Sequence, residues 1–326
     1  MRAAVIGAGA WGTALAKLLV ESGHDVVLWS HRAEGLAEMA ATRRLEHGLP
    51  RVELPASLQF ESDLAKAIQG RDFAVVSVPS KVFRNVCERM SGFRGIAVST
   101  SKGIEFETGF TMCEIIRDAI PGAARAALSG PSLAMEVAKS IPTACVAAAT
   151  DAATAQAVQS LFHCPAFRIY TNTDLHGVEL GGALKNIFAI AAGVGDGLGF
   201  GDNAKASLIT RSLAEMRRLG IACGAKADTF SGLSGLGDLT VTCFSKLSRN
   251  RCFGEQLGRG GNAEALIAGA KAVVEGHPTA KSARHLALRL GVETPIIDEV
   301  YAMLYEAKPP KLAVRDLTAR ESKAED

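Results

Sequence analysis

The chain begins with a glycine-rich turn between a short apolar run and a helical pattern. Ala3–Ile6 is typical of a buried strand, and Thr13–Val20 has apolar residues at helical spacing. The turn reads Gly7-Ala-Gly9-Ala-Trp11-Gly12, a GxGxxG pattern whose glycines suit a tight turn, a close approach to pyrophosphate and helix–strand packing. This order predicts a Rossmann-type dinucleotide-binding domain, with phosphate at the helix N-terminus. The alternative is a glycine turn with a structural role only.

The end of the second predicted strand bears on which dinucleotide would bind. Asp25–Trp29 is followed by Ser30, His31 and Arg32, and no acidic residue occurs before Glu34. A site for NAD uses an acidic residue here to bind the ribose 2′-hydroxyl, whereas arginine suits a 2′-phosphate. We therefore expect NADP(H) to be preferred, with NAD(H) possible. Alternatively, Arg32 is only the solvated start of the next helix.

Strands and helices alternate until about residue 174, after which almost only helical patterns occur. The further predicted strands are Phe73–Val78, Gly95–Ser99, Ala124–Ser129, Thr143–Ala148 and Phe167–Tyr170, and the helices between them are Ser80–Met90, a short helix from Leu133 and Ala152–Phe162. The later helices are Leu175–Gly195, Ala204–Leu219, Lys226–Phe230, Arg251–Leu257, Ala263–Ala268, Ala280–Leu290 and Ile296–Tyr305. The alternating half predicts a parallel sheet.

The predicted fold class is therefore α/β, with a dinucleotide-binding domain over 1–174 and an all-α substrate and catalytic domain over 175–326. The charged tail after Lys308 is expected to fray.

A lysine stands in the most apolar helix of the chain. Lys185 lies within Gly177–Asn203, and its neighbours one helical turn away include Gly181 and Gly182 but no acidic residue. The glycines leave space for another part of the protein to approach. Either Lys185 extends to solvent at a domain edge, or it is a desolvated catalytic lysine that faces a ligand.

Four polar segments are candidates for the rest of a site. Lys102 follows a strand at the sheet edge where open parallel sheets bind ligands. Gly130-Pro-Ser132 also follows a strand, and Ser132 could cap a helix whose N–H groups hold phosphate. A glycine-rich run ends at Asp238, and Ser248-Arg249-Asn250-Arg251 offers guanidinium groups for phosphate. Each segment could instead be a solvated loop or a plain helix start.

Composition excludes several classes of function. The 36 basic and 34 acidic residues give a net charge of +2, so there is no electrostatic case for nucleic acid or membrane surfaces. Seven scattered cysteines favour reduced thiols and no metal site. Asp196 interrupts the longest apolar run, and Lys17 interrupts a signal-peptide-like N-terminus, so we expect a cytoplasmic protein without stable membrane insertion.

Taken together, these motifs resemble the bacterial-type NAD(P)-dependent glycerol-3-phosphate dehydrogenase family. The matching stretches run in the family's order from Gly7 to Gly276 and read GAGAWGTALA, SKGIE, LSGPS, VELGGALKNIFAIAAG, GLSGLGDLTVTC, SRNR and VVEG. The resemblance implies that Lys185 transfers the proton. It implies substrate contacts at Lys102, Gly130, Ser132, Lys185, Asp238, Ser248, Arg249 and Asn250. Asn186 and Thr242 stand where related enzymes place polar groups.

The same resemblance implies a cofactor site and a reaction. The cofactor contacts fall on Ala10, Trp11, His31, Arg32, Lys102, Ala134, Arg249, Val273 and Glu275, beside the glycines of the GxGxxG turn. The implied reaction interconverts sn-glycerol 3-phosphate and dihydroxyacetone phosphate, a phosphorylated triose, and supplies glycerophospholipid synthesis. A homodimer is expected. The alternatives are a ketopantoate or 3-hydroxyacid reductase and a non-catalytic NADP-sensing module.

Overall fold

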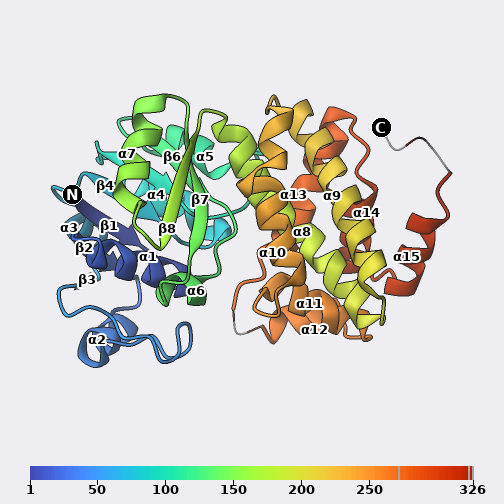
Figure 1. Ribbon diagram of the computed structural model, residues 1–326, viewed down its shortest axis with the longest axis horizontal. Coiled ribbons are helices and arrows are strands. Elements are labelled where there is room, and N and C mark those ends of the chain that lie inside the picture. The colour runs from blue at the N-terminus through green and yellow to red at the C-terminus, as the bar shows by residue number, and fades with distance from the viewer. Residues whose placement is uncertain (271, 322–323, 325–326) are drawn as a thin grey trace.

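The computed structural model describes residues 1–270, 272–321 and 324, and it has two parts that lie side by side (Figure 1). The N-terminal part is an eight-stranded sheet with its helices, and the C-terminal part is helical. The predicted fold class, a Rossmann-type domain followed by an all-α domain, is confirmed. The long helix α8 (Leu175–Gly197) begins where the two parts meet.

The sheet has the strand order β3-β2-β1-β4-β5-β6-β7-β8. Its strands are β1 (Arg2–Ile6), β2 (Asp25–Trp29), β3 (Gln59–Glu61), β4 (Phe73–Val76), β5 (Ile96–Ser99), β6 (Ala124–Ser129), β7 (Thr143–Ala149) and β8 (Phe167–Asn172). β1 pairs with β2 on one side and β4 on the other, both in parallel register. The carboxyl ends of β1 to β6 therefore lie at one edge of the sheet.

The sheet is parallel, as predicted, except at one pair of strands. β6 and β7 are antiparallel, so β7 and β8 run opposite to the other strands. The chain between them contains only the five-residue helix α6 (Ala134–Ala138). A parallel neighbour requires a crossover that returns along the whole sheet, usually through a longer helix. Because this connection is short, β7 starts near the edge at which β6 ends.

Helices cover both faces of the sheet because successive strand residues point to opposite faces. Val5 packs with α1 (Ala10–Glu21) and α7 (Ala152–Phe162), whereas Ile6 packs with α4 (Ser80–Glu88) and α5 (Met112–Ala119). The sequence patterns did not reveal α5, β3 or α3 (Leu64–Ile68), and they set no bounds for α2 (Ala33–Thr42), the helix that follows Arg32. These elements are short or weakly patterned, so periodicity alone did not find them.

The helical part is built around α8. The surrounding elements are α9 (Asp202–Ala222), the 3₁₀ turn η1 (Ala227–Ser231), the π-helical turn η2 (Leu233–Gly237), α10 (Asp238–Phe244), α11 (Arg249–Gly258), α12 (Ala263–Ala268), α13 (Gly276–Leu290), α14 (Pro295–Tyr305) and α15 (Pro310–Thr318). Within the described chain, α8 is the one helix long and apolar enough to cross a membrane, but 94% of its apolar window is buried inside the protein. It is therefore the core helix of this part.

Glycines on α8 let its neighbours approach closely. A Cβ at Gly181 would lie 2.7 Å from the Ser234 carbonyl oxygen, and one at Gly182 would lie 2.6 Å from the Ser129 hydroxyl. Both contacts are shorter than side-chain carbons allow, so neither position accepts a larger residue without a shift. The predicted role of these glycines, to admit other parts of the protein beside Lys185, is confirmed.

The predicted fraying of the tail after Lys308 is wrong for its first segment. Pro310–Thr318 forms α15, with a proline in the first turn, where its missing N–H costs nothing. The ammonium of Lys308 lies 2.6 Å from the Glu299 carboxylate and 2.9 Å from that of Asp316, so it ties α15 to α14. A charged run on the surface thus forms an ordered helix because these partners hold it.

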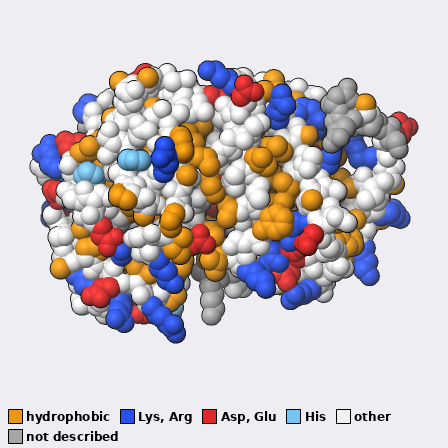
Figure 2. Space-filling view, viewed as in Figure 1, with side chains coloured by type: hydrophobic (Ala, Val, Ile, Leu, Met, Phe, Trp, Pro, Cys, Tyr) orange, Lys and Arg blue, Asp and Glu red, His pale blue; other side chains and the backbone are white. Residues whose placement is uncertain are grey.

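The surface agrees with the near-neutral composition. Figure 2 shows basic and acidic side chains interspersed, with hydrophobic side chains gathered where the two parts meet. All seven cysteines are free. The described residues contain no group of three His, Cys, Asp or Glu side chains that could hold a metal ion.

Candidate active site

Lys185 is buried and paired, although its own helix offers no carboxylate. The residue is 8% exposed, which excludes the alternative in which it extends to solvent. The ammonium donates to the Asp238 carboxylate and to the Thr242 hydroxyl, the latter at 2.7 Å. Both partners belong to α10, which packs against α8. The packing of α10 on α8 therefore supplies Lys185 with the carboxylate that its own helix lacks.

The surroundings tune the lysine toward proton exchange. Burial lowers the pKa of Lys185 to about 8, the negative charge of Asp238 acts against that shift, and Lys102 adds to it. A lysine with a pKa near the working pH can be found in both protonation states, as a general acid–base group requires. Desolvation and the charge of Asp238 thus act on this pKa in opposite directions.

Asp238 also pairs with a lysine from the other part of the molecule. The ammonium of Lys102 lies 2.5 Å from the second Asp238 oxygen and 3.2 Å from the Gly130 carbonyl oxygen. Asp238 is fully buried, and its one carboxylate pairs with two lysines across the junction. The structure thus brings four of the predicted site residues together, at the carboxyl ends of β5 and β6.

Ser132 lies beside this cluster, but the predicted helix cap is wrong. The N-cap of α6 is Leu133, and no side chain caps that helix. The Ser132 hydroxyl instead donates to the Gly130 carbonyl oxygen at 2.9 Å. Because Leu133 occupies the N-cap position, the Ser132 side chain bonds within the turn that precedes the helix.

In the segment from 248 to 251, three side chains are buried and one, that of Arg249, is exposed. Ser248 is buried and caps α11, accepting from the Arg251 N–H at 3.2 Å. Asn250 donates to the Asn186 side chain at 2.8 Å and accepts from the Gly276 N–H at 2.9 Å. Asn250 therefore binds α11 to α8 and α13, whereas Ser248 stabilises the start of α11.

Only one of the two arginines in this segment is available. The Arg251 guanidinium is buried, and it lies 2.6 Å from Asp196 and 3.0 Å from Glu255. Arg249 is exposed and has no ion pair among the described residues. It lies close enough to Glu275 to lower the pKa of that carboxyl, which burial raises. Arg249 is thus the guanidinium that a phosphate could reach.

The turn between β1 and α1 has the shape that a dinucleotide requires. Gly7 has a φ of +123°, and a Cβ there would lie 2.4 Å from the Ser77 carbonyl oxygen. A Cβ at Gly12 would lie 2.0 Å from the Gly7 carbonyl oxygen. Nothing lies within 4 Å of a Cβ at Gly9, so open space adjoins the uncapped N-terminus of α1. This space and the free helix N–H groups fit a pyrophosphate.

The remaining predicted cofactor residues lie around that turn in two groups. Ala134 packs with Ala10 and Trp11 beside α1. His31 and Arg32 are exposed beyond the end of β2, and the Arg32 N–H donates to the Ser30 hydroxyl at 3.2 Å. The Arg32 guanidinium has no ion pair among the described residues, so it is free to meet an anion.

Glu275 joins the helical part to the sheet through a residue that sequence reasoning missed. Its carboxylate accepts from the Ser80 hydroxyl at 2.5 Å and from the Ser80 N–H at 3.2 Å. The neighbouring Val273 is 43% exposed. Ser80 follows Pro79 at the start of α4, on the connection that leaves β4 at the strand edge where ligands bind, and this position could have identified it.

Comparisons with known proteins identify the family of this chain. The family described as NAD-dependent glycerol-3-phosphate dehydrogenase matches through its N-terminal model at residues 2–155 and its C-terminal model at residues 174–315. A glycerol-3-phosphate dehydrogenase [NAD(P)+] of Geobacter sulfurreducens is 50% identical, and the alignment covers 99% of this chain and 98% of the relative. The chain belongs to the NAD(P)-dependent glycerol-3-phosphate dehydrogenase family. A relative of the same description from Chlorobium phaeobacteroides is 47% identical over 100% of this chain and 99% of its own length.

Solved structures support the same assignment. A glycerol-3-phosphate dehydrogenase of Coxiella burnetii superposes with a TM-score of 0.94 at 37% identity, covering 98% of this chain and 99% of its own. A ketopantoate reductase of Ralstonia eutropha reaches a TM-score of 0.63 at 17% identity, covering 98% and 100% of the two chains. That second likeness concerns the fold alone. The alternative of a ketopantoate reductase therefore shares the architecture of this chain but not its family.

Proposed function

We propose that this chain interconverts sn-glycerol 3-phosphate and dihydroxyacetone phosphate with NAD(P)(H). The observation that carries the proposal is the buried Lys185, paired with Asp238 and Thr242 beside the sheet edge that holds the GxGxxG turn. The family membership supports the substrate pair and the nicotinamide cofactor. Lys102 and Gly130 complete the polar wall of the proposed substrate site.

The proposed mechanism uses Lys185 as the group that exchanges a proton with the substrate. When bound, the nicotinamide accepts or supplies the hydride. In the oxidation, neutral Lys185 takes the proton of the C2 hydroxyl; in the reduction, the ammonium polarises the C2 carbonyl and donates a proton to its oxygen. Asp238 and Thr242 hold the lysine nitrogen in place, because each accepts a hydrogen bond from it. Positioned proton transfer of this kind contributes roughly 10²–10⁴-fold to the rate.

The decisive assay follows NADPH oxidation with dihydroxyacetone phosphate as substrate, beside a parallel assay with ketopantoate. We expect turnover with the phosphorylated triose and none with ketopantoate. Turnover with ketopantoate alone would contradict the proposed substrate. The absence of turnover with both, in a protein that binds NADPH, would favour a non-catalytic sensing module.

We expect Arg249 to hold the substrate phosphate. Arg249→Ala should raise the KM for dihydroxyacetone phosphate about tenfold or more, because a charge-assisted hydrogen bond is worth roughly 1.5–3 kcal/mol. The matched control is Lys246→Ala, which removes an exposed cation three residues earlier. If the variant has the wild-type KM, the phosphate is held elsewhere and Lys102 becomes the next residue to test.

We expect Arg32 to set the preference for NADPH over NADH. Its guanidinium is exposed and unpaired among the described side chains beyond β2, where no carboxylate is available for a 2′-hydroxyl. Arg32→Ala should raise the KM for NADPH about tenfold through loss of one charged contact, and leave the KM for NADH nearly unchanged. Both constants are measured at one ionic strength, since salt screens exposed charges. Equal losses with the two cofactors would show that Arg32 supports the adenosine pocket in general.

Three broader assignments belong to the same proposal. The division at residues 174 and 175 separates a cofactor domain from a substrate domain, and α8 begins at that point. The enzyme acts in the cytoplasm and supplies glycerol 3-phosphate for glycerophospholipid synthesis.

It forms a homodimer, which is supported by large apolar side chains that are exposed near the end of α10, such as Phe244 at 48% and Leu247 at 59%. Sedimentation at two protein concentrations measures the oligomeric state.

A further inference from the structure

A cavity in the helical part lies apart from the residues of the candidate site. It lies between the C-terminal third of α8 and the helices α9, α14 and α15, and its volume is about 660 Å³. None of the residues assigned above to substrate or cofactor lines it. A volume of this size is typical of sites for small organic ligands.

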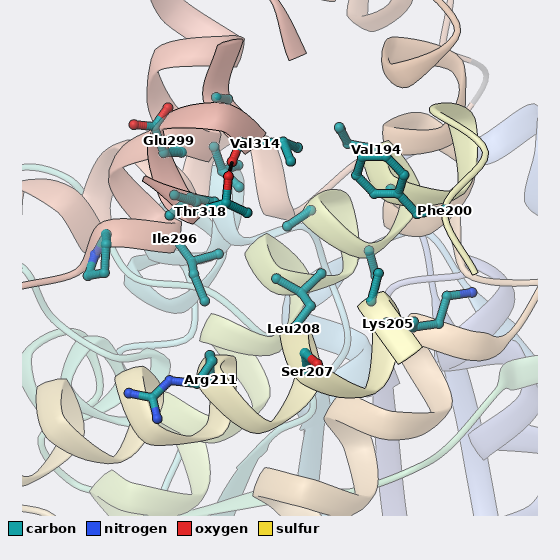
Figure 3. A pocket seen from close by; sticks show the side chains of 18 of the residues that line it. Val194, Phe200, Lys205, Ser207, Leu208, Arg211, Ile296, Glu299, Val314 and Thr318 are labelled. Carbon is teal, nitrogen blue, oxygen red and sulfur yellow. Dashed lines mark hydrogen bonds between the residues drawn. The ribbon is translucent and has the colours of Figure 1, made fainter. Parts of the chain in front are cut away.

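The wall of this cavity is mainly aliphatic. Figure 3 shows Val194, Leu208 and Ile296 around one space, with Val314 of α15 on its other side. Phe200 and Arg211 lie on opposite sides of the same space, and the aliphatic side chains lie between them (Figure 3). The ligand that such a wall favours has an extended apolar portion.

Three of the four acidic residues of the lining already have partners. Asp196 pairs with Lys205 at 2.7 Å and with Arg251. Glu299 pairs with Lys308 at 2.6 Å. Glu215 is buried, and its two oxygens accept from the N–H groups of Ile296 and Ile297, at 3.0 and 2.9 Å, at the start of α14. Glu321 is exposed at the rim.

Most of the basic residues of the lining also have an ion-pair or hydrogen-bond partner. Lys205 is held by Asp196, and Arg320 lies 3.2 Å from the Glu293 carboxylate. Arg218 donates to the Glu293 carbonyl oxygen at 3.0 Å. Arg211 differs from these three, because it is half-buried and has neither an ion pair nor a hydrogen bond from its side chain among the described residues. A half-buried guanidinium of this kind is stabilised by an anion.

We propose that this cavity binds an amphiphile with a single acyl chain and an anionic head. The head group lies at Arg211, and the chain lies along Leu208, Ile296 and Val194 toward Phe200. A fatty-acid carboxylate and an acyl phosphate share this chemistry. The proposal concerns binding only, so its test is independent of turnover and of the cofactor.

The test is calorimetric titration of the full-length protein with dodecanoate below its micelle concentration. Dodecyltrimethylammonium serves as a probe with the same chain and the opposite charge, and butyrate as a probe with the head group and almost no chain. We expect saturable binding of dodecanoate at one site per chain, and binding at least about tenfold weaker for the other two probes. Dodecyl phosphate, measured in the same way, distinguishes a phosphate head from a carboxylate head.

Four substitutions, one of them a control, locate the site. Arg211→Gln should weaken dodecanoate binding about tenfold, whereas Arg217→Gln, on an exposed position of the same helix, should leave it unchanged. Leu208→Trp should abolish binding by filling the cavity, and Val314→Trp repeats that test from α15 in case the first variant does not fold. Equal binding of the anionic and cationic probes, or wild-type binding in both tryptophan variants, would overturn the proposal. So would failure of dodecanoate to bind, including failure because a second copy of the chain seals the cavity.

Discussion

Replacement of Lys185 by alanine is expected to lower kcat at least about 10²-fold in both reaction directions, while NADPH binding and folding persist. The lysine is the only basic group in contact with both Asp238 and Thr242 among the described residues, so no neighbour takes over its proton. The measurement is steady-state turnover of dihydroxyacetone phosphate, with NADPH affinity determined separately by fluorescence titration.

Two further variants sharpen this experiment. Lys185→Arg should not restore activity, because a guanidinium does not release its proton near neutral pH. Lys226→Ala removes an exposed lysine of the helical part and should have the kcat of the wild type. Turnover of Lys185→Ala within a few-fold of wild type would remove Lys185 from the chemistry.

Replacement of Asp238 by asparagine is expected to change both the rate and its pH dependence. The reduction requires protonated Lys185, so the wild-type rate should fall as pH rises through the pKa of about 8. Asp238 raises that pKa, whereas burial and Lys102 lower it. Without the carboxylate the pKa falls further, so the alkaline loss of reductase activity should begin at lower pH. A change of one pKa unit corresponds to about 1.4 kcal/mol.

The same substitution should also destabilise the fold. It leaves the buried ammonium of Lys185 and the partly buried one of Lys102 without their counter-ion, and removing one partner of a buried pair costs roughly 3–5 kcal/mol. Asp228→Asn, at an exposed position of the same part, is the matched control. Thermal unfolding measures stability, and the pH–rate profile measures the lysine. An unchanged alkaline limb in Asp238→Asn would show that this limb does not report Lys185.

The sequence by itself determined the features that depend on local pattern. The GxGxxG turn predicts β1, α1 and the phosphate cradle, because only glycine fits at Gly7 and Gly12. The apolar periodicity located β2, β6, α7 and the buried helix α8, since each has a regular pattern with clear boundaries. The motifs also named Lys185 and Asp238 as site residues from segments that are distant in the chain.

Only the tertiary structure decided how these side chains are used. Lys185 has no acidic neighbour on its own helix, so its pairing with Asp238 arises from the packing of α10 on α8. Ser248 and Arg251 look like phosphate ligands in the sequence, but packing turns them inward as a helix cap and a buried ion pair. A sequence pattern records which side chains are polar, whereas burial and the partners brought by folding determine which of them remain free for a ligand.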